Sequence, residues 1–260
     1  MTGPAGLPGF ALITGATAGL GASFTRRLAA EERDLVLVAR DVERLTALAA
    51  DLSERYPITV EVLPADLSTE AGCQAVAERI ARSDQPIDTL INNAGIGLYR
   101  AFGRAPLEDE LRMLDLNVRA VLMLTHAAVL AMKPRGRGEI INISSVAGFL
   151  PRGAAATYAA SKSWVTTFTE GLALQLADSG VRATAICPGF TRTEFHQRAS
   201  ADMSGVPSLL WLDADRVVAD GLADARAGKV ISVPSKRFRA ILLLVKLLPR
   251  PLVARVIGRR

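Results

Sequence analysis

The stretch FALITGATAGLG, residues 10–21, joins a short apolar run to three closely spaced glycines. Its first five residues predict a buried strand, and a helical pattern begins directly after the glycines. Gly15 suits a tight turn, Gly19 lets backbone amides approach a pyrophosphate, and Gly21 allows the helix to pack closely on the strand. Amides near Leu20, at the helix N-terminus, would face the negative charge. Three glycines alone can form a simple turn, but between a strand and a helix they favour dinucleotide binding.

The same alternation of short apolar runs and helical segments continues along the chain of 260 residues, without an internal repeat or low-complexity stretch. The runs are almost continuously hydrophobic, as central parallel strands covered on both faces are. The predicted fold class is therefore α/β: a single Rossmann domain whose doubly wound, seven-stranded parallel sheet has helices on both faces and ligands at the carboxyl ends of its strands. Expected strands are 10–14, 35–39, 59–64, 89–92, 139–144, 182–187 and 229–233, and expected helices are 22–32, 42–55, 70–83, 107–133, 157–178 and 214–227.

Length and charge limit the classes of function. A half-hydrophobic chain of this length can form one large core, and we expect one domain over residues 1–235 followed by a basic tail, residues 236–260. The net charge of +5 belongs to this tail, which holds eight Lys and Arg and no acid, against 23 basic and 26 acidic residues before it. A nucleic-acid groove is therefore not expected. The sequence carries no secretory pattern, so a cytoplasmic protein is expected.

The cysteines and histidines predict no metal site. Cys73 and Cys187 lack the partners of a disulfide framework or zinc site and are expected to be buried as small apolar residues. His126 lies in an apolar helical run and is expected in the core. His196 follows the sixth strand and could touch a substrate. Neither histidine has the spacing of a metal pair or of a Ser-His-Asp arrangement.

Three motifs in order carry a family resemblance. TGATAGLG at 14–21, NNAG at 92–95 and TYAASK at 157–162 resemble the short-chain dehydrogenase/reductase family, over residues 8 to about 195. The resemblance implies a nicotinamide cofactor that exchanges hydride with a carbonyl compound or secondary alcohol. It places the following residues in the cofactor site: Gly15, Thr17, Gly19, Leu20, Gly21, Arg40, Asp66, Leu67, Asn93, Ala94, Gly95, Tyr158, Lys162, Pro188, Gly189, Thr191 and Thr193.

The end of the second strand favours NADP(H) over NAD(H). An acidic residue there would bind the ribose 2′-hydroxyl of NAD, but the chain has Ala39 followed by Arg40. A guanidinium suits a 2′-phosphate through charge-assisted hydrogen bonds, although Arg40 could also be a solvated arginine. Many NADP-using relatives carry a second basic residue where this chain has Ala18. We therefore expect a preference that need not be strict.

Two further segments resemble cofactor contacts of the family. ADL at 65–67 matches the adenine contact, with the Asp66 carboxylate near the amino group, although Asp66 could instead cap a helix starting near Ser68. Residues 93–95 end the fourth strand, where small side chains leave room for a cofactor. PGFTRT at 188–193 resembles the segment that lies along the nicotinamide.

Tyr158 and Lys162 lie four residues apart and therefore share one face of a helix. A phenol with a pKa of about 10 is a reluctant acid near neutral pH, and a nearby ammonium favours its phenolate. We expect Tyr158 to donate a proton to the developing alkoxide during reduction. The resemblance implies that Lys162 also hydrogen-bonds the nicotinamide ribose.

Two other residues complete the expected catalytic set. Ser145 in NISSVAG follows a strand, and its hydroxyl suits polarising a carbonyl and stabilising the oxyanion. The family's spacing to the tyrosine favours Ser145 over Ser144. Asn117 in LDLNV matches a helix asparagine whose backbone carbonyl holds a water linking the lysine to solvent. Each of these residues taken singly could also be structural, but their order and spacing favour catalysis.

The substrate end of the chain is less informative. Residues 191–213 occupy the place of a substrate lid, and Leu209–Leu212 could cover an acyl chain or pack on the body. The leading hypothesis is an NADPH-dependent reductase of an apolar carbonyl compound, such as a 3-oxoacyl thioester. The alternative is a dinucleotide-binding sensor without turnover, or a membrane-surface scaffold.

The tail and the helical pattern suggest possible contacts. The apolar residues 240–248 are too few to span a bilayer, but the tail could lie on an anionic membrane surface. It could equally pack on the substrate pocket or a partner subunit. Oligomers are usual in the family, and we expect a homodimer or homotetramer through the helices that contain Asn117 and Tyr158.

Overall fold

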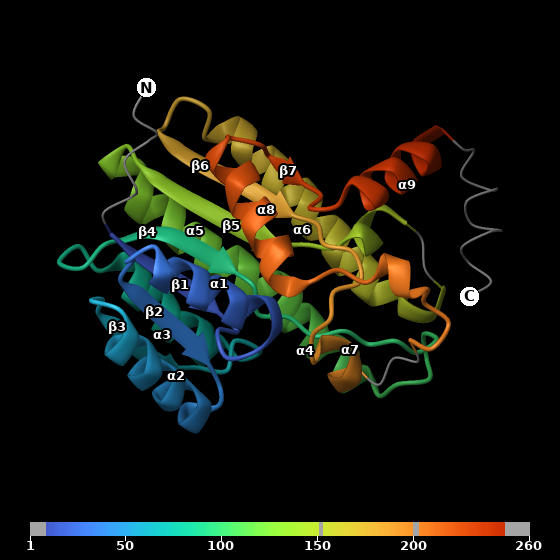
Figure 1. The fold of residues 1–260 in the computed structure, drawn as a ribbon, viewed down its shortest axis with the longest axis horizontal. Helices are drawn as coiled ribbons and strands as arrows, with labels where there is room; N and C mark the ends of the chain where they lie inside the picture. The colour runs from blue at the N-terminus through green and yellow to red at the C-terminus, as the bar shows by residue number, and fades with distance from the viewer. Residues whose placement is uncertain (1–8, 151–152, 200–202, 248–260) are drawn as a thin grey trace.

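A parallel sheet organises the computed structural model, which describes residues 9–150, 153–199 and 203–247. Figure 1 shows this sheet between two layers of helices. The strands follow the order β3-β2-β1-β4-β5-β6-β7, and every neighbouring pair is parallel. The predicted α/β class with a doubly wound, seven-stranded sheet is therefore confirmed. The strands are β1 (Phe10–Thr14), β2 (Leu35–Ala39), β3 (Val60–Pro64), β4 (Ile87–Asn92), β5 (Gly138–Ile143), β6 (Val181–Ile186) and β7 (Ile231–Ser232).

Alternate residues of each strand pack on opposite helical layers. Leu12 and Val36 belong to a core with one layer, whereas Ile13 and Leu37, which lie opposite each other in register, belong to a core with the other layer. This burial on both faces explains why the strands are almost continuously apolar. The first layer contains α3 (Glu70–Ala81), α5 (Ala120–Met132) and α6 (Ala156–Gln175), and the second contains α1 (Gly19–Ala30), α2 (Val42–Arg55) and α8 (Ala214–Arg226).

The long helix expected over 107–133 is interrupted. It consists of α4 (Leu107–Leu114), a π turn over Asp115–Arg119, and α5. A π turn inserts one residue into the helical spacing and often occurs at a functional site. The run is long and apolar enough to resemble a membrane span. However, the inner side of α5 packs in the core beside α3, which is the position of a core helix in a sheet protein.

The prediction that His126 is buried in the core was wrong. His126 is exposed on α5, one turn from each of the exposed leucines Leu122 and Leu130. Because α5 is apolar on nearly all sides, its periodicity does not reveal which side faces the sheet. Both cysteines, in contrast, are free and buried as expected.

The described part of the tail packs on the body. Helix α9 (Lys236–Leu247) buries Phe238 and Leu242 against Val146 and Leu150 from the segment after β5. A Cβ on Gly189 would lie only 2.0 Å from the Phe238 ring, so the helix sits directly on the segment after β6. The exposed residues Leu243, Leu244 and Leu247 face away from this core. Residues 248–260, on which part of the predicted membrane contact rests, lie outside the described residues.

Candidate active site

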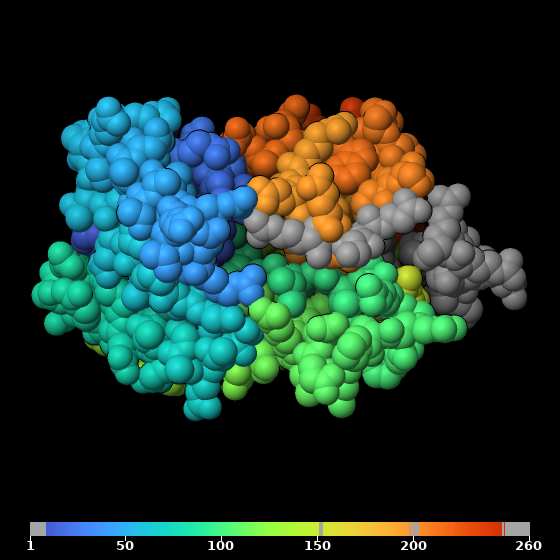
Figure 2. Space-filling model, turned by 90° about the horizontal axis from the view of Figure 1, so that it is seen from below, coloured from blue at the N-terminus to red at the C-terminus, as the bar shows by residue number. Residues whose placement is uncertain are grey.

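A cavity of about 890 Å³ opens at the carboxyl ends of the strands. Segments that follow β1 to β6 line it, as expected for the ligand crevice of a doubly wound sheet. Figure 2 shows this face of the molecule, hollowed between the blue N-terminal segments and the green and orange segments that follow in the sequence. Nearly all the predicted site residues meet here. The lining includes Gly15, Thr17, Gly19, Leu20, Arg40, Asp66, Leu67, Asn93, Ala94, Gly95, Ser145, Tyr158, Lys162, Pro188, Gly189, Thr191 and Thr193.

The glycine turn fits a phosphate. Gly15 and Gly19 have positive φ values of 65° and 52°, which favour glycine. Gly21 does not line the cavity, but a Cβ on it would lie 2.0 Å from the carbonyl oxygen of Gly15. Helix α1 begins after Ala18 without a side-chain cap and without an acid in its first turn. Its first N–H groups and positive dipole end therefore remain available to an anion such as a pyrophosphate.

The end of the cavity where the adenosine is expected, called the adenosine end below, carries arginines around one aspartate. Asp66 accepts hydrogen bonds from the amide and hydroxyl of Ser68, at 3.0 and 2.7 Å, and Arg40 Nη1 lies 4.0 Å from its Oδ2. Burial opposes ionisation of Asp66, but the bonds from Ser68 and the charges of Arg40 and Arg112 outweigh it and lower its pKa. The alternative that Asp66 caps a helix was wrong, because Thr69 caps α3. Asp66 is therefore ionised near neutral pH, and Arg40 lies beside it in the cavity wall.

Lys162 is held at the buried end of the cavity. Its Nζ donates to the carbonyl oxygen of Ile143 at 2.8 Å and lies 5.9 Å from the centre of the Tyr158 ring. Only 5% of Lys162 is exposed, and this burial lowers its pKa to about 8 despite the opposing effect of Cys187. The ammonium therefore predominates at neutral pH, close to the phenol.

The structure distinguishes the two serines after β5. Ser144 Oγ donates to the carbonyl oxygen of Lys162 at 2.7 Å and lies 2.7 Å from Thr166 Oγ1, so Ser144 fixes α6 against the sheet. Ser145 Oγ accepts from the amide of Ala147 at 3.1 Å. A hydroxyl that accepts can still donate its own proton. This arrangement favours Ser145 as the donor to a substrate oxygen.

Asn117 does not line the cavity but supports its wall. It is fully buried in the π turn, where Oδ1 accepts from the Ile96 amide at 3.0 Å and Nδ2 donates to the Ile96 carbonyl at 2.8 Å. Its Nδ2 also lies 3.3 Å from Ser161 Oγ, which donates to the carbonyl oxygen of Tyr158. Asn117 thereby connects the segment after β4 with α6. The role of the Asn117 backbone carbonyl, to hold a water that links Lys162 to solvent, stays a prediction.

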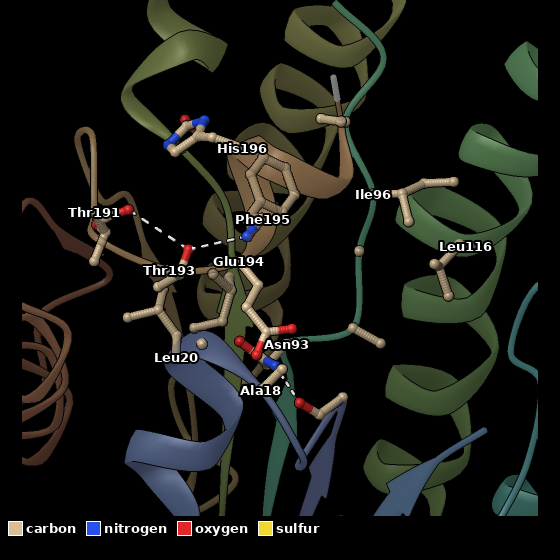
Figure 3. A pocket seen from close by; sticks show the side chains of 18 of the residues that line it. Ala18, Leu20, Asn93, Ile96, Leu116, Thr191, Thr193, Glu194, Phe195 and His196 are labelled. Atoms are coloured by element: carbon tan, nitrogen blue, oxygen red, sulfur yellow. Dashed lines mark hydrogen bonds between the residues drawn. The ribbon is translucent and has the colours of Figure 1, made fainter. Parts of the chain in front are cut away.

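Aromatic side chains surround Tyr158 at the end of the cavity where the substrate is expected, called the substrate end below. The rings of Tyr99 and Phe195 lie 5.7 and 5.8 Å from it, on the segments after β4 and β6. His196, in the short helix α7 (Phe195–Arg198), lies 5.4 Å from Trp211 in an edge-on contact. Figure 3 shows Phe195 and His196 on this side of the cavity, opposite Ile96 and Leu116.

The leucine-rich part of the expected lid is partly exposed and partly packed on the body. Ser208–Leu210 form a single 3₁₀ turn, in which Leu209 is exposed. Leu210 and Leu212 instead pack with Phe190 and α9 in one apolar cluster. This segment thus packs on the body and supports Phe190, which lines the cavity.

Sequence reasoning missed several residues that line the cavity. They lie on the segment after β4 or on helices α2 and α4, and carry no motif of their own. Their only signal is a position shortly after the end of a strand or on an exposed helix turn, which many solvent-exposed residues share. They include Arg44, Ile96, Tyr99 and Arg112. The lining residues Phe190, Glu194, Phe195 and Ala199 belong instead to the segments 188–193 and 191–213 that were expected near the nicotinamide and the substrate.

Comparison with known proteins agrees with this geometry. A family model described as short chain dehydrogenase matches residues 9–204. Sulfoacetaldehyde reductase 2 of Chromohalobacter salexigens is 35% identical over 82% of this chain and 84% of its own. A short-chain dehydrogenase from Sphingobium yanoikuyae, solved with NADPH, superposes with a TM-score of 0.84 at 36% identity, covering 94% and 97% of the two chains. A bulky-bulky ketone specific alcohol dehydrogenase from Comamonas testosteroni gives a TM-score of 0.79 at 31% identity, covering 95% and 96%.

Proposed function

Because this chain belongs to the short chain dehydrogenase family, an oxidoreductase family acting on alcohol and carbonyl groups, we propose that it is an NADPH-dependent reductase of bulky apolar carbonyl compounds. The observation that carries the proposal is the convergence of Ser145, Tyr158 and Lys162 at one end of a cavity whose other end has Arg40. A dinucleotide sensor without turnover would need the glycine turn and the arginine. It would not need the serine, the tyrosine and the lysine together.

The three residues can divide the chemistry of reduction. The nicotinamide, when bound, supplies the hydride that reduces the carbonyl carbon. Ser145 donates a hydrogen bond to the carbonyl oxygen and stabilises the negative charge that develops there. Tyr158 gives its phenolic proton to that oxygen, and the buried ammonium of Lys162 stabilises the phenolate that remains. The same residues acting in reverse serve alcohol oxidation.

The adenosine end supports a preference for NADPH over NADH. Arg40 suits a 2′-phosphate. Ala39 occupies the position where an acidic residue would bind NAD, so no carboxylate there repels the phosphate. The similar enzyme from Sphingobium yanoikuyae was solved with NADPH. Asp66, 4.0 Å from Arg40, competes for the guanidinium and weakens the preference.

The walls of the substrate end favour a large apolar ketone. Tyr99 and Phe195 present rings within 6 Å of Tyr158, and such rings pack well on flat hydrocarbon surfaces. Among the described lining residues, the basic side chains at this end are His196 and Lys162, and Lys162 is engaged by the Ile143 carbonyl. The likeness to the Comamonas bulky-ketone enzyme points the same way.

A 3-oxoacyl thioester is the second candidate substrate. An apolar cluster continues from Phe190 through Leu210 and Leu212 to Phe238 of α9. A long acyl chain could follow this cluster away from Tyr158. The same site would then recognise chain length and not a ring.

We expect NADPH oxidation to be faster with bulky cyclic and aryl ketones than with acetone or sulfoacetaldehyde. Initial rates at 340 nm over a ketone series, and over 3-oxoacyl thioesters of increasing length, separate the two candidates. A parallel series with NADH measures cofactor preference. Equal rates with small and bulky ketones would contradict the assignment of the aromatic wall, and rates that rise only with acyl length would favour the thioester.

We also propose a homodimer or homotetramer that pairs α5 and α6 with their copies. Leu122 and Leu130 on α5 and Leu174 on α6 are exposed, and a copy of the chain packed on these helices would cover them. Sedimentation equilibrium is expected to give at least twice the chain mass. A monomer at micromolar concentration would refute this proposal.

A further inference from the structure

An ion pair at the mouth of the cavity joins two distant parts of the chain. Arg44 Nη1, in the first turn of α2, lies 3.6 Å from Glu194 Oε2, just before α7. The two side chains are 52% and 47% exposed, and both line the cavity. Arg44 follows Arg40 by four residues in the sequence, across the extended N-cap Asp41, and its Nε lies 3.6 Å from Asp41 Oδ2. Arg44 therefore reaches both the adenosine end of the cavity and the segment after β6.

Glu194 lies over the glycine turn. Figure 3 shows its side chain directed from the segment after β6 toward the turn that contains Ala18 and Leu20. Contacts place the preceding residue there as well, since a Cβ on Gly19 would lie 3.2 Å from the Thr193 side chain. The positive end of α1 attracts an anion at this point. The carboxylate thus competes with phosphate groups for the same region of positive potential.

We propose that Arg44 is a second specificity-determining residue for the cofactor, shared between Glu194 and the 2′-phosphate of NADPH. This inference rests on the proposed NADPH preference. A phosphate near neutral pH carries more charge than a carboxylate and offers several acceptor oxygens, so it holds a guanidinium more strongly than a half-exposed carboxylate does. Arg44 thereby supplies the second cation that Ala18 does not provide.

Release of Glu194 from Arg44 would transmit cofactor binding at the adenosine end to the aromatic residues at the substrate end. Glu194 directly precedes α7, whose Phe195 ring lies 5.8 Å from Tyr158 and whose His196 ring lies 5.4 Å from Trp211. A change of partner for Arg44 therefore alters the restraint on the aromatic wall. Binding of NADPH, whose 2′-phosphate would take Arg44 from Glu194, would loosen this restraint, whereas NADH lacks that phosphate and would leave the ion pair in place.

Cofactor binding to the intact protein tests the first part of the proposal. Arg44→Gln is expected to raise the Kd for NADPH about tenfold and to leave the Kd for NADH within about twofold, as judged from nicotinamide fluorescence. Glu194→Gln is expected to lower the Kd for NADPH several-fold, because the competing carboxylate is removed. Arg55→Gln is the matched control: Arg55 lies in the last turn of the same helix, is 55% exposed and pairs with Asp51.

The fluorescence of Trp211 tests the second part of the proposal, the loosened restraint on the aromatic wall. The chain has two tryptophans, so Trp164→Phe leaves Trp211 as the single emitter. Adenosine 2′,5′-bisphosphate, which occupies only the adenosine end, is expected to change its fluorescence, whereas 5′-AMP is not. Arg44→Gln in this background should abolish the change even at saturating bisphosphate.

The outcomes separate this inference from the function on which it rests. NADPH binding by Arg44→Gln with wild-type affinity would overturn the inference and leave the reductase proposal intact. Equal weakening of NADPH and NADH would also overturn it, because the contact would then not involve the 2′-phosphate. Failure of the wild type to bind either cofactor would overturn both the cofactor assignment and the inference.

Discussion

Replacing Tyr158 with phenylalanine is expected to lower kcat for NADPH-dependent reduction by about 10³-fold or more. General acid catalysis contributes about 10²–10⁴-fold, and the substitution removes the phenolic proton. It keeps the ring that packs against Tyr99 and Phe195, at 5.7 and 5.8 Å. The fold and the cofactor turn should therefore be unaffected. Initial rates measured with the best ketone of the series, beside the Kd for NADPH, test both statements.

A matched variant shows what the tyrosine contributes beyond the hydrogen bond of the serine. Ser145→Ala removes a donor to the oxyanion but leaves the proton source, so a loss of about 10²–10³-fold is expected. The double variant should be little worse than Tyr158→Phe, because the two residues act on one oxygen. Turnover of Tyr158→Phe within tenfold of the wild type would assign the proton to another group. Loss of NADPH binding in that variant would instead show that the ring holds the cofactor.

The sequence is sufficient to predict the sheet and the catalytic helix because their determinants are local. Residues 10–21 hold a strand, a turn and a helix start within twelve positions, and the structure gives Gly15 and Gly19 the positive φ that this spacing requires. Tyr158 and Lys162 share a helix face for the same local reason. The bounds of the strands are predicted less exactly. Strand β7 comprises only Ile231–Ser232 of the expected 229–233, because only these residues pair with β6.

The features that sequence reasoning missed depend on contacts between distant segments. Glu194 meets Arg44 across 150 positions, and no spacing rule relates them. The π turn at Asp115–Arg119 arises where Asn117 bonds the backbone of Ile96. The prediction of a buried His126 was wrong because α5 is apolar on nearly all sides, so its sequence does not show which side faces away from the sheet. Tertiary context decides each of these cases.

Replacing Lys162 with methionine is expected to abolish turnover and, at the same time, to stabilise the protein without its cofactor at pH 7. Burial lowers the pKa of Lys162 from 10.5 to about 8, so the folded state carries a costly ammonium at every pH below 8. The shift corresponds to about 3 kcal/mol. The lost hydrogen bond to the Ile143 carbonyl offsets about 1 kcal/mol of this gain. The free energy of unfolding at pH 7 should therefore rise by about 2 kcal/mol.

The pH dependence gives this prediction its sign. Between pH 8 and 10.5 the unfolded chain binds more protons at Lys162 than the folded chain does, so wild-type stability from this residue increases with pH. The advantage of Lys162→Met should shrink over this range and vanish near pH 10, as measured by urea unfolding at pH 7 and pH 10. Lys236→Met, at an exposed lysine, is the control and should change stability at neither pH. A variant less stable than the wild type at pH 7 would show that the ammonium stabilises the fold. The lysine would then be a structural residue that chemistry also uses, whereas the expected result makes it a charge kept at a cost in stability for catalysis.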